Sequence, residues 1–251
     1  MAKAYHIFEA DTFPTLTLGT SLRVPNQSSL LEDILVPDTT FDVVTPNFHS
    51  GFTKCTVHYE QLVKVFGRLH DRTFNEFIRP FDFDAYVHYS PTFVAFAGKS
   101  EIVNDAVHIM NMGLPDFQLR RERLDLKKLL PSISYLKGAW WKVKNPNLSA
   151  QALFGEHVDR DLSFDQAMKY GDRISTLMLK YEYGSEFILS SILEACGIVF
   201  YESMQVEKEL DIVLEVKQSL LDSVIIPDNS LPLGNNVGDS FLPLNADGSD
   251  L

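Results

Sequence analysis

Residues 119–144 combine positive charge with the two tryptophans of the chain, Trp140 and Trp141. Eight basic residues against two acids give this segment a net charge of +6, in a chain whose net charge is −12. Such segregation creates a local positive field that attracts an anionic partner. The candidate nucleic-acid or anion-binding residues are Arg120, Arg121, Arg123, Lys127, Lys128, Lys137, Trp140, Lys142 and Lys144.

Arginine and lysine side chains neutralise phosphates, and tryptophan rings stack on unpaired bases. Because the segment reads as extended chain, it fits single-stranded or loop recognition better than insertion of a helix into a groove. A strand over 138–144 places Trp140 and Lys142 on one face and Trp141 and Val143 on the other. We therefore expect that only one of the two tryptophans can be exposed. The alternative interpretation is a solvated edge strand, in which lysines prevent aggregation and tryptophans fill the core.

Two short patterns suggest a metal-dependent nuclease as a competing function. Pro115-Asp116 followed by Asp125-Leu126-Lys127 locally resembles the catalytic pattern of restriction-endonuclease-like nucleases, in which carboxylates hold Mg²⁺ and a lysine positions the attacking water. Asp211, Glu215 and Lys217 form a second, more closely spaced version. Neither pattern has complete spacing, so we favour a non-catalytic protein and assign no catalytic residue.

Other clusters have simpler interpretations. His157, Asp159 and Asp161 have a spacing that could wrap a loop around a cation, but an acidic loop before a capped helix explains them as well. Gly98-Lys99-Ser100 resembles the end of a phosphate loop without its upstream glycine, and a helix start explains it. We predict no metal site and no cofactor.

The composition limits the partner and the compartment. An isoelectric point of about 5.0 argues against general coating of nucleic acid, so any such contact must be confined to a patch. Cys55 and Cys196 are expected to be buried free thiols, as in a reducing compartment. The N-terminus lacks the apolar core of a secretory signal, and no run of about 18 apolar residues exists. These features predict a cytoplasmic protein with no membrane contact.

The pattern of elements predicts an α+β fold. We expect mostly antiparallel sheet with short helices, one long C-terminal helix over 204–225 and a flexible acidic tail. Apolar spacing over 59–79 predicts a helix that ends at Pro80, and Ser100 begins another helix through Met112. Residues 174–203 predict an antiparallel meander.

Interruptions at Gly113 and Pro115 predict three regions: an N-terminal α+β region over 1–114, a C-terminal α+β region over 115–226 that holds the basic segment, and a tail over 227–251. The alternative is that the chain before the tail forms a single domain. The tail carries four acids and no basic residue, with leucines and Phe241 between them. Such a segment can dock on a partner or a sister subunit. A protein-binding subunit of a larger complex is therefore a third function to consider, besides the nucleic-acid binder and the nuclease.

Overall fold

The computed structural model describes residues 2–25, 36–70, 72–90, 92–145, 148–170 and 173–226. Its strands form one 12-stranded sheet in the order β2-β3-β4-β5-β6-β1-β12-β11-β10-β8-β9, with β7 paired to β1. Every pairing between these strands is antiparallel. The tail predicted over 227–251 lies outside the described residues.

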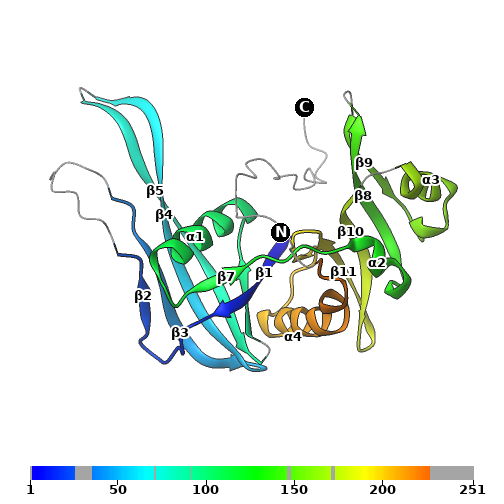
Figure 1. Cartoon of the computed structure of the whole chain (residues 1–251), viewed down its shortest axis with the longest axis horizontal. Helices are drawn as coiled ribbons and strands as arrows, with labels where there is room; N and C mark the ends of the chain where they lie inside the picture. The colour runs from blue at the N-terminus through cyan, green and yellow to red at the C-terminus, as the bar shows by residue number, and fades with distance from the viewer. Residues whose placement is uncertain are drawn as a thin grey trace.

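The strands differ greatly in length. They are β1 (Lys3–Thr12), β2 (Ser21–Arg23), β3 (Thr39–His49), β4 (Phe52–Leu69), β5 (Arg72–Tyr89), β6 (Thr92–Ala97), β7 (Gln118–Arg120), β8 (Leu136–Asn145), β9 (Leu148–Phe154), β10 (Arg173–Tyr183), β11 (Glu186–Leu193) and β12 (Gly197–Phe200). The two longest strands, β4 and β5, form a hairpin that extends away from the rest of the molecule (Figure 1).

The α-helices are α1 (Ser100–Gly113), α2 (Leu126–Leu129), α3 (Leu162–Tyr170) and α4 (Val206–Val216). Short 3₁₀ turns occupy Leu130–Ser132, Val158–Arg160 and Asp222–Val224. A π-helical segment, Lys217–Leu221, follows α4 directly. Such π segments place backbone and side chains out of the regular helical phase, often near a special local contact.

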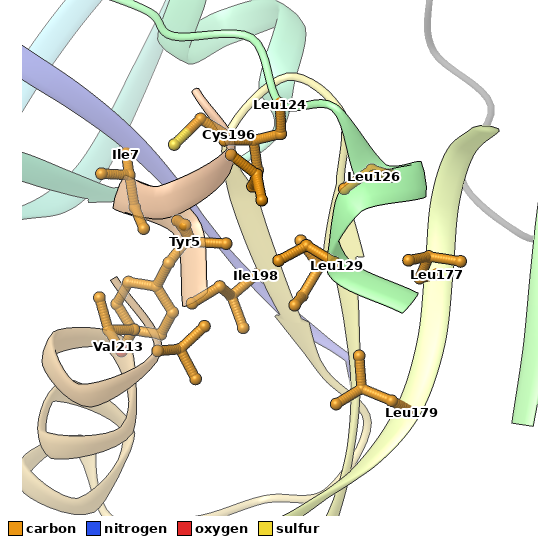
Figure 2. Close-up of a cluster of buried hydrophobic side chains, with 14 of the residues drawn as sticks. Tyr5, Ile7, Leu124, Leu126, Leu129, Leu177, Leu179, Cys196, Ile198 and Val213 are labelled. Carbon is orange, nitrogen blue, oxygen red and sulfur yellow. The ribbon is translucent and has the colours of Figure 1, made fainter. Parts of the chain in front are cut away.

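Strand β1 lies at the centre of the sheet and contributes to two hydrophobic cores. Tyr5 and Ile7 point into the first core, which packs α2, α3 and α4 against one face of β8, β10, β11 and β12. Figure 2 shows both side chains together with Leu124, Leu177 and Val213 from distant parts of the chain. Phe8 belongs to the second core, which packs α1 against β3, β4, β5 and β6. Because side chains alternate along a strand, β1 supplies both faces of the sheet.

The predicted α+β fold class is wrong. Strands dominate the described residues and join into one continuous sheet, whereas the helices are short additions to its faces. The long helix expected over 204–225 divides into α4, the π-helical segment and a 3₁₀ turn. Propensity and apolar spacing identified most strands separately, but sheet continuity depends on pairings between residues far apart in sequence.

The helix predicted over 59–79 is also wrong, because these residues form the outer part of the β4–β5 hairpin. A β-bulge between Lys64 and Gly67 places Val65 and Phe66 opposite Asn75. A bulge shifts the alternation of side chains by one residue, so the apolar positions no longer follow a period of two. That shift produced a spacing close to the helical one.

The sheet continues through both predicted α+β regions. Strand β1 pairs with β6 of the first region and with β12 and β7 of the second. The division into 1–114 and 115–226 stays a prediction. Among the described residues, no helix has the length and apolar character needed to cross a membrane.

Candidate functional site

The basic segment does not form a single exposed surface. Its residues lie on β7, in the segment between β7 and α2, on α2 and on β8, which are separate parts of the fold. Arg120 forms ion pairs with Glu122 at 2.6 Å and with Asp11 at 3.6 Å. Much of its charge is therefore already compensated inside the protein.

Arg121 is a structural residue. Its Nε donates to the backbone oxygen of Ala195 at 2.6 Å, and its Nη1 donates to Asn104 at 2.7 Å and to Ser100 at 3.0 Å. Its Nη2 donates to Nδ1 of His6 at 2.8 Å. Burial lowers the pKa of Arg121 to about 10, which leaves the group charged at neutral pH. The side chain joins α1, β1 and the β11–β12 turn, and few donors remain for a ligand.

Arg123 shares an acidic partner with Arg173 of strand β10. Its Nε and the Nε of Arg173 each lie 2.7 Å from Oε1 of Glu194, whose side chain is buried. Lys127 lines a shallow pocket beside this cluster, and Lys128 lies 3.6 Å from Asp125. Arg123 and Lys128 are thus also paired with acids.

Strand β8 carries the remaining candidates. Lys137 forms an ion pair with Glu156, Lys142 is half-buried, and Lys144 lies near the end of the strand. The expected separation of the tryptophans is confirmed: Trp141 is fully buried against Phe164, whereas Trp140 is half-buried on the opposite face and contacts Phe154 edge to face at 4.6 Å. Trp140 and Lys142 lie on the same face of the sheet.

The acidic residues of the nuclease-like patterns each contact a different part of the protein. Asp211 accepts hydrogen bonds from Ser50 at 2.6 Å and from His49 at 2.9 Å, and these fasten the β3–β4 turn to α4. Glu215 accepts a hydrogen bond from Tyr181 at 2.7 Å. Asp125 lies beside Lys128. Among the described residues, no three potential metal ligands converge.

The other clusters considered from sequence have structural partners. His157 packs its ring against Tyr135, and Asp161 accepts a hydrogen bond from the backbone of Ser163 at the start of α3. Hydrogen bonds with the side chain and with the backbone of Ser163 lower the pKa of Asp161. Ser100, at the start of α1, is already bonded to Arg121.

Lys217 is a deeply buried cation, with a side chain 2% exposed. It lies in the π-helical segment and forms ion pairs with Glu9 of β1 and with Asp222. Burial disfavours its charge, but hydrogen bonds to Asp222 and Glu9 outweigh that effect and raise its pKa. The lysine stays protonated at neutral pH, so it acts as a structural cation and not as a nucleophile.

The hairpin formed by β4 and β5 is the feature that sequence analysis missed. Strand β3 pairs with β4 as far as Tyr59, and β6 pairs with β5 from Asp84 onward. We call residues 61–69 of β4 and 72–79 of β5 the arm, because among the described residues its strands pair only with each other. At about 3.4 Å per residue, the arm extends roughly 30 Å.

The arm exposes large apolar side chains. Phe66 is 77% exposed, Val65 is 45% exposed and Phe77 is 39% exposed. Residues 61–79, which include the arm and the two residues between its strands, carry four basic side chains and two acids, so this stretch has a net charge of +2 in a chain of net charge −12. An isolated two-stranded hairpin is marginally stable in water, and exposed apolar patches mark interaction sites. The sequence signal for this hairpin was the enrichment of Val and Phe in the segments that flank His70.

No protein-family model matches this sequence, and no curated protein is significantly similar to it.

Proposed function

We propose that this chain is a non-catalytic, protein-binding subunit of an assembly, and that the arm is its main contact. The observation that carries the proposal is the arm itself: two strands that pair only with each other among the described residues and that expose Phe66, Val65 and Phe77. Covering a large apolar side chain contributes about 1.5–3 kcal/mol, so a partner that covers these three gains substantial binding free energy.

The geometry of the arm favours a protein over a nucleic acid. Its charge of +2 is small, and the rest of the chain carries −14, which repels phosphates. Both edges of the arm carry backbone groups that can pair with an extended strand of a partner. The positive arm also suits the acidic surfaces that many soluble proteins present.

Binding of nucleic acid at residues 119–144 stays the competing hypothesis. Trp140 and Lys142 share one face, and the side chains of Arg123 and Lys128 are 51% and 65% exposed. The ion pairs of Arg120, Arg123 and Lys128 weaken this hypothesis, because each pair must be given up to contact a phosphate.

Photo-crosslinking of the full chain in its native cells separates these functions. A benzophenone side chain is placed at position 66 in the arm, at position 140 in the basic segment, or at the exposed control position Leu18. We expect protease-sensitive adducts from position 66 and none from Leu18. Nuclease-sensitive adducts from position 140, with none from position 66, would establish nucleic-acid binding instead.

The compartment that we propose is the cytoplasm. Cys55 and Cys196 are buried and form no disulfide. Burial raises the pKa of both thiols to about 12, so they are protonated and unreactive. Two free thiols fit a reducing compartment.

A further inference from the structure

Residues 224–226, the last that the structure describes, lie against the basic segment. They run antiparallel to residues 123–125: Leu124 and Ile225 form a β-bridge, and the backbone nitrogen of Ile226 donates to the oxygen of Arg123 at 2.8 Å. This short ladder places Ile226 directly opposite Arg123. Side chains that lie opposite each other share a face, so these two point to the same side.

A small pocket opens beside this ladder. Leu124, Ile174 and Ile226 form apolar parts of its wall, and Arg173 and Glu194 form polar parts. Its volume is about 120 Å³. Sites for whole small molecules usually measure about 300–1,000 Å³. The pocket therefore suits a single side chain of a polypeptide, and Ile226 brings the chain itself to its rim.

The charged side chains at this pocket carry an excess of positive charge. We call them the basic cluster, which consists of Arg123, Lys127, Lys128, Arg173, Asp125 and Glu194. Four cations and two acids give it a net charge of +2. Arg123 and Arg173 each place Nε 2.7 Å from the same carboxylate oxygen of Glu194, so one acid serves two guanidinium groups. Both arginines remain accessible to a further acid, because their side chains are 51% and 40% exposed.

Arg121 places a third guanidinium group next to the same turn. Its Nε donates to the backbone oxygen of Ala195, the residue after Glu194. Its hydrogen-bond acceptors among the described residues are all neutral: the oxygens of Ala195, Ser100 and Asn104, and Nδ1 of His6. A carboxylate nearby would stabilise this charge even without a direct hydrogen bond.

Residues 227–251 supply acids and no cation. The acids are Asp228, Asp239, Asp247 and Asp250. Asp228 follows Ile226 by two residues, so their Cα atoms can lie at most about 7 Å apart. Side chains two residues apart in extended chain lie on the same side, which here is the side of Arg123. Pro227 has a fixed φ and favours extended backbone at Ile226, which lowers the entropy lost when the contact forms.

We propose that the carboxylate of Asp228 binds the basic cluster at Arg123, on the side of Arg121, and competes there with anionic partners. The contact lowers the net charge of the basic cluster from +2 to +1. An exposed ion pair contributes little to folding, so the contact occupies the surface without holding the fold together. A phosphate must displace Asp228, because both need the same guanidinium group.

Paired substitutions in the full chain separate this contact from the general charge of residues 227–251. Asp228→Asn and Asp247→Asn each remove one negative charge and nearly preserve the shape of the side chain. A nonspecific effect of charge should be similar in both variants. Only Asp228→Asn should free the basic cluster.

Paramagnetic broadening reports the contact itself. The native thiols of Cys55 and Cys196 are buried, so a nitroxide attaches only at the introduced Ser230→Cys. In the labelled chain, the amide signals of Glu194 and Ala195 should be strongly broadened. The broadening should persist with Asp247→Asn and should be mostly lost with Asp228→Asn. Equal broadening in the two asparagine variants overturns the proposal.

Fluorescence anisotropy of a labelled oligodeoxythymidylate at low salt reports the competition. Asp228→Asn should bind this probe roughly two- to fivefold more tightly than Asp247→Asn, which is the range expected for one exposed ion pair. Adding Arg123→Ala to Asp228→Asn should cancel the gain. Equal affinities of the two asparagine variants, or no binding by either, overturn the competition.

The arm takes no part in this contact, so its failure and the failure of the proposed function are distinguishable. Phe66→Ser should abolish crosslinks from the arm and leave the broadening at Glu194 and Ala195 unchanged. Loss of that broadening in Phe66→Ser would show that the arm, and not the basic cluster, holds residues 227–251, and would overturn the proposal.

Discussion

Nη2 of Arg121 donates a hydrogen bond to Nδ1 of His6 over 2.8 Å, and Nε2 of the same histidine donates to the backbone oxygen of Gly98 over 3.1 Å. The arginine thereby determines which ring nitrogen of His6 carries the proton. A residue that the charge pattern identified as a ligand-binding cation instead connects the basic segment to the central strand.

This connection predicts that Arg121→Ala is strongly destabilising. The substitution leaves the backbone oxygen of Ala195 and the side chain of Asn104 without their charged donor, and we expect a loss of about 2–4 kcal/mol in the free energy of unfolding. Lys128→Ala is the matched control, because its side chain is exposed and should contribute less than about 1 kcal/mol. Urea unfolding measures both. Equal effects would contradict the structural role of Arg121.

The burial of His6 predicts that the folded protein loses stability in acid. Burial, with a smaller contribution from the charge of Arg121, lowers the pKa of His6 to about 3 from 6.5. Between these values the unfolded chain binds a proton that the folded chain does not, so stability falls as the pH decreases from 6.5 toward 3. A decrease from pH 6.5 to 4.5 should cost about 2–3 kcal/mol. His6→Gln retains a donor and an acceptor and should flatten this dependence in unfolding experiments.

His58 serves as a control, because its pKa is shifted in the opposite direction from that of His6. Its hydrogen bond to Asp82 raises its pKa, so its contribution is fully present below pH 6.5 and is lost as the pH rises through the folded-state pKa. His58→Gln should therefore leave the acid slope unchanged. An acid slope that survives His6→Gln would show that another group causes it.

We predict that removing the buried charge of Lys217 greatly lowers the free energy of unfolding. Lys217→Ala leaves Glu9 without its partner in the centre of the fold, and breaking such a pair costs about 3–5 kcal/mol. Lys208→Ala is the comparison, since its pair with Glu186 is at the surface and should contribute less than about 1 kcal/mol. Thermal and urea unfolding should separate the two variants clearly. A loss below about 1 kcal/mol for Lys217→Ala would contradict the proposed structural role.

The contacts of residues 224–226 predict how far the C-terminus can be shortened before stability falls. Leu124 and Ile225 form a β-bridge, and the backbone nitrogen of Ile226 donates to the oxygen of Arg123 at 2.8 Å. Truncation after Ile226 should leave thermal stability nearly unchanged, because residues 227–251 have no regular apolar period that would repay about 1–2 kcal/mol of ordering per residue. Truncation after Asp222 also removes buried Val224 and should lower the melting temperature by several degrees. A large decrease for the first truncation would show that the tail belongs to the fold.

The sequence by itself determined several local features. The start of α1 at Ser100 and the opposite orientations of Trp140 and Trp141 follow from local preferences and from side-chain alternation. The burial of both cysteines also followed from their apolar surroundings.

Only the tertiary structure decided the rest. Arg121 and Arg123 find partners on α1 and on the β11–β12 turn, which are distant in sequence. Arg120 pairs with Asp11 of β1 as well as with its neighbour Glu122. The arm was mistaken for a helix because a bulge disturbed its alternation, and only pairing with a second strand resolves the ambiguity. A local pattern reports the preference of a segment, whereas pairing across a sheet and compensation of charge depend on residues that folding alone brings together.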